Sequence, residues 1–220
     1  ASPDSIVGNK TVYTYRKSLG FELAKENNIS ADVVVPIPDS GVSAALGFSQ
    51  KSSIPFELGI IRSHYVGRTF IEPSQTIRQF GVKLKHSVNR SCIEDKRVIL
   101  IDDSIVRGTT ASKIVKMVYE AGAKEVHLGI SCPPIKHPDF YGIDTPNYNE
   151  LIASKSSIEE MTKLVGAKSL FFLSLNGTYK AMGYNERNKE LPQFTDHCFT
   201  GEYPIDISEI LKINSYNASR

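Results

Sequence analysis

The chain has 220 residues, of which 40% are hydrophobic and 23% are charged, a composition typical of globular domains. Its 26 Lys and Arg residues against 24 Asp and Glu give a net charge of +2, which is too small for the broad basic surface of a dedicated nucleic-acid binder. We therefore expect one compact domain over 1–220 that binds no nucleic acid and grips any polyanionic ligand locally.

The cysteines and the apolar runs bear on the compartment and on membrane contact. Cys92, Cys132 and Cys198 are widely spaced and form no CxxC pair, so they predict neither a disulfide framework nor a structural zinc site. Apolar runs such as 98–101 are strand-sized and far shorter than the roughly 20 residues of a membrane helix. The first residues lack the basic and apolar regions of a signal peptide. We expect a cytoplasmic protein without membrane contact.

Helical and extended patterns alternate along the chain. Periodicity and turn residues predict helices over 13–26, 41–51, 109–121, 149–153, 157–165 and 174–182, and strands over 32–37, 56–62, 97–101, 125–130 and 169–173. Strand 32–37 is apolar without alternation, as in a parallel strand covered on both faces. The polar, basic segment 63–90 is a candidate lid, and the tail 183–220 is mostly irregular. This order predicts a single α/β domain with a parallel sheet flanked by helices.

The most informative stretch is 98–110, where an apolar strand runs into acidic and hydroxyl residues. Asp102 and Asp103 end the strand, at the edge where open parallel sheets bind their ligands. The residues that open the next helix are suited to hold a phosphate with hydroxyls and free backbone N–H groups: Ser104, Gly108, Thr109 and Thr110. The two carboxylates would repel that phosphate, so we expect them to face ribose hydroxyls or a hydrated Mg²⁺. The simpler alternative, a helix cap, needs only one short polar residue.

This stretch resembles the phosphoribosyl-diphosphate (PRPP) signature of type I phosphoribosyltransferases, in which two acids after an apolar strand precede a Gly-Thr-Thr phosphate loop. The sequence of residues 101–110, IDDSIVRGTT, is similar to that of one family, the amidophosphoribosyltransferases. Further strings that resemble this family occur along nearly the whole chain: VPIPDS (35–40), YVGRTFI (65–71), YGID (141–144), ELIA (150–153) and CFTGEYP (198–204). The resemblance implies the type I phosphoribosyltransferase fold. It also implies the formation of 5-phosphoribosylamine and diphosphate from PRPP and ammonia, the first step of purine synthesis.

The resemblance assigns roles to individual residues. Those implied to bind substrate are Asp39, Ser40, Gly41, Asp102, Asp103, Ser104, Arg107, Gly108, Thr109 and Thr110. Ser40, Asp102 and Asp103 are implied to hold Mg²⁺, although Ser40 also suits a plain helix N-cap. Gly41 is expected to take a backbone conformation that turns N–H groups toward diphosphate.

A catalytic loop that closes over PRPP is implied for the segment from 62 to 85. The catalytic residues implied on it are Arg62, Tyr65, Arg68 and Lys85. Arg62 stands where the family is expected to carry Lys, a change that keeps the charge and alters the donor geometry. The alternative for these basic side chains is an ordinary solvated surface loop.

Two departures from the family pattern concern cofactors and domains. Some members hold a four-iron cluster on cysteines, whereas the matching positions here keep only Cys198 and have Asp139 at the first cysteine position. One or two thiolates cannot hold such a cluster, so no iron–sulfur cluster is predicted. The N-terminal glutaminase domain of the family, which supplies ammonia, has no counterpart in this sequence.

The resemblance further implies feedback inhibition by purine nucleotides and a homo-oligomer. Two alternatives remain open from the residues. One is a phosphoribosyltransferase that acts on a free base, and the other is a module that binds PRPP or purine nucleotides without chemistry.

Overall fold

The computed structural model describes residues 2–62, 86–143, 145 and 147–208. Its centre is a four-stranded, fully parallel sheet in the order β3-β6-β7-β8. The strands are β3 (Val33–Pro36), β6 (Arg97–Asp102), β7 (Glu125–Ile130) and β8 (Ser169–Phe172). The predicted parallel sheet is confirmed.

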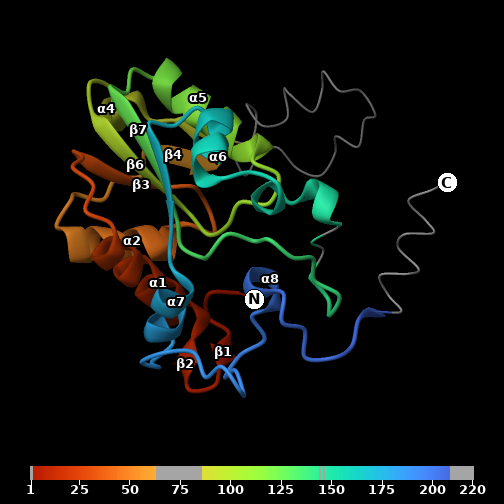
Figure 1. Cartoon of the computed structure of the whole chain (residues 1–220). Coiled ribbons are helices and arrows are strands. Elements are labelled where there is room, and N and C mark those ends of the chain that lie inside the picture. Colours follow the sequence, from red (N-terminus) through yellow and green to blue (C-terminus); the bar gives the residue numbers. More distant parts are fainter. Residues whose placement is uncertain (1, 63–85, 144, 146, 209–220) are drawn as a thin grey trace, which may run out of the picture.

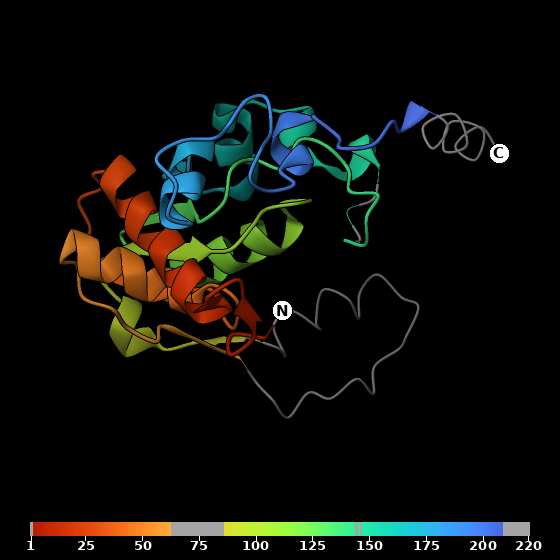
Figure 2. The same cartoon turned by 90° about the horizontal axis from the view of Figure 1, so that it is seen from below.

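Helices cover both faces of this sheet (Figures 1 and 2). On one face lie α1 (Val12–Glu26) and α2 (Val42–Ser52), and on the other lie α5 (Thr109–Glu120) and α6 (Ile158–Val165). Helix α7 (Leu175–Ala181) follows β8 and packs against α1. The helices predicted over these five ranges are confirmed, each to within one or two residues.

The apolar strands divide their side chains between two cores. Val33 and Val35 belong to the cluster that includes α5 and α6, whereas Val34 faces α1 and α2. The neighbouring strand β6 alternates in the same way, because Leu100 joins the first cluster and Ile101 the second. All five side chains are at most 1% exposed. A parallel strand buried on both faces needs this continuous apolar run.

Local sequence signals set the helix ends. Ser157 and Glu160 form a capping box at the start of α6, and Gly166 ends that helix with φ +75°. Ser174 caps α7, where its hydroxyl accepts from the Gly177 N–H at 2.8 Å. Both helices therefore begin within one residue of the predicted starts at 157 and 174.

Several short elements differ from the prediction. The strand expected over 56–62 is reduced to β4 (Ile60–Arg62), because Phe56 makes only an isolated bridge to Val34. The short helix expected over 149–153 is instead two 3₁₀ turns, η1 (Tyr148–Glu150) and η2 (Ile152–Ser154). A hairpin of β1 (Ile6–Val7) and β2 (Lys10–Thr11) was not predicted.

The lid predicted over 63–90 stays a prediction, and only its last residues are described. Residues 63–85 lie outside the described residues, and the rest of the segment is regular. β5 (His86–Val88) pairs antiparallel with β4, and α4 (Arg90–Ile93) follows it. Ile93 is fully buried in the core, so this part of the chain is anchored.

The tail was predicted to be mostly irregular, and its described part is nevertheless tied to the domain. It contains one helical turn, α8 (His197–Thr200). The Arg187 Nε donates to Asp196 Oδ2 at 2.6 Å, and the Tyr179 hydroxyl of α7 donates to the same oxygen at 2.7 Å. Asp196 is buried, so these bonds fix the tail against α7.

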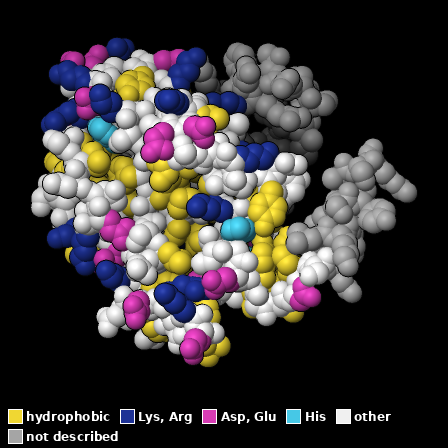
Figure 3. Space-filling model, viewed as in Figure 1, with side chains coloured by type: hydrophobic (Ala, Val, Ile, Leu, Met, Phe, Trp, Pro, Cys, Tyr) yellow, Lys and Arg dark blue, Asp and Glu magenta, His cyan; other side chains and the backbone are white. Residues whose placement is uncertain are grey.

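The described helices include none long and apolar enough to cross a membrane. On the face shown in Figure 3, basic and acidic side chains are interspersed, in keeping with the near-balanced composition.

Candidate functional site

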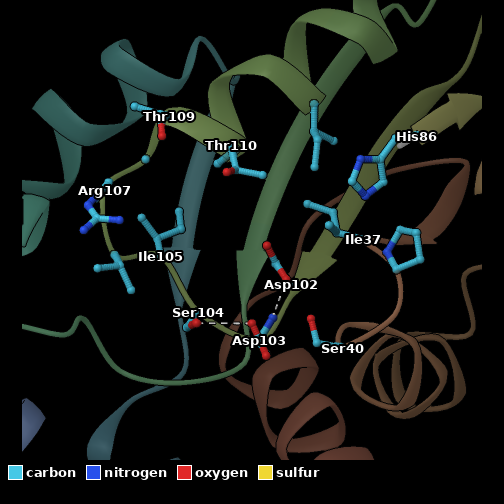
Figure 4. A pocket seen from close by; sticks show the side chains of 15 residues that line it. Ile37, Ser40, His86, Asp102, Asp103, Ser104, Ile105, Arg107, Thr109 and Thr110 are labelled. Carbon is cyan, nitrogen blue, oxygen red and sulfur yellow. Dashed lines mark hydrogen bonds between the residues drawn. The ribbon is translucent and has the colours of Figure 1, made fainter. Parts of the chain in front are cut away.

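A pocket of about 360 Å³ lies at the carboxyl ends of β3 and β6 (Figure 4). It is lined by residues of four segments: Ile37, Pro38 and Ser40 after β3, His86 of β5, Asp102–Gly108 after β6, and Thr109, Thr110, Ala111 and Ile114 of α5. Eight of the ten residues implied to bind substrate therefore line the same cavity: Ser40, Asp102, Asp103, Ser104, Arg107, Gly108, Thr109 and Thr110. This is the edge of a parallel sheet where ligands bind.

The start of α5 offers donors to this pocket. The first backbone bond of the helix runs from the Ser112 N–H to the Gly108 carbonyl at 2.9 Å. In the part of the chain that the structure describes, the N–H groups of Thr109 and Thr110 therefore have no protein acceptor. Gly108 precedes them with φ +76°, a conformation that a side chain would strain. Free N–H groups, two exposed hydroxyls and the helix dipole together suit a phosphate group.

The two carboxylates stand at the opposite side of the cavity from those threonines. The Asp103 N–H donates to Asp102 Oδ1 at 2.8 Å, and the Ser104 hydroxyl donates to Asp103 Oδ1 at 3.1 Å. The Asp102 carbonyl is fixed by Ser131, the residue after β7, which donates its N–H at 3.0 Å. The acids are thus held by their own loop and by the next strand.

Burial, followed by the negative charge of Asp103, raises the pKa of Asp102 to about 7, while the Ser40 hydroxyl acts in the opposite direction. A cation beside the pair would favour its ionised form. Ser40, Asp102 and Asp103 present only oxygen donors to the pocket, which is the donor set that Mg²⁺ prefers. The residues present therefore fit the ion that the family resemblance implies.

The turn after β3 places Asp39 beside a residue from a distant part of the chain. Arg62, the last residue of β4, lies with its Nη1 at 2.6 Å from Asp39 Oδ2. Both side chains are exposed, so the pair is solvated. The structure thus joins a residue implied to bind diphosphate with one implied to be catalytic.

Gly41 differs from its expected conformation. Its φ is −74°, in the right-handed region, and its N–H donates to the Ile37 carbonyl at 3.0 Å, so it is not free for a ligand. A Cβ at this position would lie 2.3 Å from the Ile101 carbonyl oxygen. Close packing of the turn against β6 therefore requires the glycine. The peptide bond between Pro38 and Asp39 is cis.

Three of the four residues implied to be catalytic, Tyr65, Arg68 and Lys85, lie outside the described residues, and their roles stay predictions. The structure adds one residue to the pocket, His86, that the sequence analysis did not predict. His86 lines the pocket, and its Nδ1 is buried without a hydrogen-bond partner in the described structure. Its register opposite Arg62 depends on the β4–β5 pairing, which no local signal predicts.

Arg107 also has a partner that the sequence did not indicate. Its guanidinium forms an ion pair with Glu150 of η1, 43 residues away. Glu150 belongs to the family-like string 150–153, but no role was predicted for it.

A second cluster of titratable groups lies away from the pocket. Asp139, His197 and Cys198 could hold a metal ion by their spacing, and His197 Nε2 lies 2.6 Å from Asp139 Oδ1. Burial acts to raise the pKa of Asp139, but backbone donors and His197 outweigh it and lower the pKa below its usual value. Burial raises the pKa of the Cys198 thiol to about 11, so it is neutral near pH 7. The prediction that the chain holds no iron–sulfur cluster rests on the sequence.

Comparisons with known proteins show the family to which the chain belongs. Residues 16–141 match the family described as phosphoribosyl transferase domain, and the chain belongs to that family. Its sheet and flanking helices are the type I phosphoribosyltransferase fold, as the resemblance predicted.

Several relatives that match nearly the whole chain are named amidophosphoribosyltransferase. That of Rhizobium etli is 63% identical over 205 residues, which cover 93% of this chain and 41% of the relative. That of Bacillus subtilis is 51% identical and is covered to 43%. The solved structure of the B. subtilis glutamine PRPP amidotransferase, complexed with ADP and GMP, superposes with a TM-score of 0.86 at 50% identity. It covers 95% of this chain and 46% of its own, so the chain spans less than half the length of these relatives.

Proposed function

We propose that this chain transfers the phosphoribosyl group of PRPP to ammonia, which yields 5-phosphoribosylamine and diphosphate and opens purine nucleotide synthesis. The observation that carries the proposal is one pocket that holds two adjacent carboxylates at the end of β6 and the open N-terminus of α5. The names of the relatives support the nucleophile, because nothing in the pocket itself distinguishes ammonia from other acceptors.

Each part of PRPP is matched by residues that line the pocket or adjoin the residues that line it. The 5-phosphate lies on the loop from Ser104 to Thr110, where the N–H groups and hydroxyls of Thr109 and Thr110 have no partner in the described structure. The ribose hydroxyls donate to Asp102 and Asp103. Diphosphate lies at the turn Asp39–Gly41, next to the Arg62 guanidinium. The order along the pocket thus follows the order of groups in the substrate.

Ser40, Asp102 and Asp103 would hold Mg²⁺, which when bound would supply positive charge to stabilise the leaving diphosphate. Arg62 provides a second positive charge at the same end, and Tyr65, Arg68 and Lys85 complete the catalytic set in this proposal. In this proposal the catalytic loop over 62–85 closes over the substrate and excludes water, which would otherwise attack the ribose.

The reaction balances without a general base. The bond between C1 of the ribose and the diphosphate oxygen breaks, and its electron pair leaves with diphosphate. The lone pair of ammonia forms the new C1–N bond, and the ammonium nitrogen then loses one proton to solvent. Neutral ammonia is already nucleophilic, so the protein's task is to stabilise the leaving group and orient both reactants.

The proposal includes the wider setting of the relatives. Ammonia comes from glutamine through a glutaminase domain, as the family resemblance implies, while this chain forms the phosphoribosyltransferase domain of a cytoplasmic homo-oligomer. Purine nucleotides are proposed inhibitors, since their 5′-phosphate suits the same loop and the B. subtilis structure carries ADP and GMP.

Release of diphosphate from PRPP with Mg²⁺ tests the proposal. High ammonium at alkaline pH is compared with glutamine, with free purine and pyrimidine bases, and with no nucleophile. The proposal predicts release with ammonium. Release that depends on a base would favour a base-specific transferase, and tight PRPP binding without release would favour a non-catalytic sensor.

A further inference from the structure

The phosphate loop does not stand alone, because the segment Tyr148–Ser154, here called the brace, lies against its outer side. The brace consists of the two 3₁₀ turns η1 and η2. It is anchored in the domain by Leu151, which is fully buried, and by Ala153, which is 8% exposed. The brace is therefore a fixed part of the domain and not a loose loop.

The brace bonds to two successive residues of the phosphate loop, Val106 and Arg107, and lies beside the third, Gly108. The Ile152 N–H donates to the Val106 carbonyl at 2.9 Å. Glu150 Oε2 accepts from Arg107 Nε at 2.5 Å and also pairs with Arg107 Nη2. The Ile152 Cδ1 lies 3.1 Å from the position that a Cβ on Gly108 would occupy. A backbone hydrogen bond and an ion pair thus hold this turn of chain, and Ile152 leaves little room for a side chain at Gly108.

The ion pair directs Arg107 away from the acids. Figure 4 shows the Arg107 side chain at the rim of the pocket, well apart from Asp102. Its guanidinium is 59% exposed and Glu150 is 39% exposed, so the pair itself adds little to folding stability. The ion pair instead fixes the position of the loop. It joins Arg107, which lies just before the free N–H groups at the start of α5, to the anchored brace.

We propose that Glu150 is a positioning residue for the 5-phosphate site, acting through Arg107. This inference rests on the proposed function, because it concerns the same pocket. Glu150 touches no part of the substrate; it holds the loop in the conformation that directs the N–H groups of Gly108, Thr109 and Thr110 into the cavity. Ordering this loop before binding lowers the entropy that phosphate binding costs.

A different role for Glu150 makes the opposite prediction. If it only neutralised Arg107, then its removal would free a guanidinium for the phosphate and tighten binding. Positioning predicts weaker binding instead, because the freed Arg107 and its neighbours sample other conformations. The sign of the change in affinity therefore decides between the two roles.

Titration calorimetry of E150Q with ribose 5-phosphate and, separately, with Mg²⁺-diphosphate tests the inference. We expect ribose 5-phosphate to bind about tenfold more weakly than to the wild type, and diphosphate to change by less than about twofold, since only the phosphate loop is affected. E120Q is the matched control, because Glu120 pairs with Lys116 on the exposed side of α5, outside the pocket. In an R107A background, E150Q should cause no further loss.

Four results would overturn the inference. Equal or tighter binding of ribose 5-phosphate to E150Q excludes positioning. An equal loss for both ligands indicates general loosening of the fold. Full additivity of E150Q and R107A shows that Glu150 does not act through Arg107. A wild-type protein that binds diphosphate but no ribose 5-phosphate would contradict the proposed function itself, and the inference with it.

Discussion

Arg62 and Asp39, which are 23 residues apart, meet at 2.6 Å between the end of β4 and the turn after β3. The pair places a guanidinium at the proposed diphosphate end of the pocket before any substrate is bound. Because Arg62 is 48% exposed and Asp39 59% exposed, the pair contributes little to stability. The pair matters instead because it positions the Arg62 charge where diphosphate is proposed to bind.

R62A is therefore expected to separate activity from folding. Loss of a cation at the leaving group should lower ammonium-dependent kcat/KM by about a hundredfold, with little change in melting temperature. R90A provides the control, because Arg90 pairs with Glu94 in an equally exposed ion pair away from the pocket. R62A activity equal to that of R90A would exclude a role for Arg62. R62K should recover only part of the loss, since lysine lacks the planar donor fork.

His86 gives a prediction in which stability and binding change in opposite directions. Its buried Nδ1 lacks a partner in the described structure, which costs free energy unless a ligand pairs with it. H86L replaces the imidazole by an apolar side chain of similar length and so removes the unpaired polar atom. The variant should therefore have a higher melting temperature and a several-fold higher KM for PRPP. S87A, on the exposed face of β5, is the control. A higher melting temperature with unchanged KM would show that His86 does not contact PRPP.

The ion pair of Asp32 with Arg97 predicts a pH dependence of stability. Hydrogen bonds from Arg97 lower the pKa of Asp32 to about 2, below that of the unfolded chain. A lowered folded-state pKa means that the stabilisation is complete above about pH 4 and is lost as the pH falls from about 4 toward 2.

Thermal melts of D32N and the wild type at several pH values test this dependence. D32N should melt below the wild type at pH 7, and the difference should shrink as the pH falls to 3. D95N is the matched control, because Asp95 is 83% exposed and lies 3.9 Å from Lys124. A difference that grows on acidification would contradict the assignment.

The buried pair of Asp139 and His197 is expected to hold the tail on the domain. Asp139 also accepts the N–H groups of Tyr141 and Ile143, at 2.9 and 2.7 Å, so its carboxylate is satisfied from both sides. Removing one member of a buried pair typically costs about 3–5 kcal/mol. H197A should cost an amount in this range in urea unfolding, and D139N/H197A should cost less than the sum of its single variants. Strict additivity would mean that the two side chains do not interact.

The central architecture could be predicted because its signals are local. Val33–Val34–Val35 and the apolar part of β6 are continuous apolar runs. Ser157 caps α6 and Ser174 caps α7. The pocket could be predicted because the ends of parallel strands meet at one edge, so Asp102 and Ser40 lie together by topology.

What could not be predicted depends on contacts between distant segments. Glu150 meets Arg107 across 43 residues, and His86 enters the pocket through its pairing with β4. Neither contact leaves a periodic pattern in the sequence. Gly41 shows the same limit: its identity was predicted to matter, but the reason is the nearby Ile101 carbonyl and not an unusual φ.

The most direct test of the central claim is ammonium-dependent diphosphate release by D102N/D103N beside the wild type, with circular dichroism of both proteins. The account predicts that the variant folds normally, because Asp102 and Asp103 are held mainly through backbone groups and Ser104. It also predicts release that falls to background, because both the ribose contacts and the magnesium ligands are lost. A folded variant that releases diphosphate at the wild-type rate would contradict the assignment of this pocket as the PRPP site.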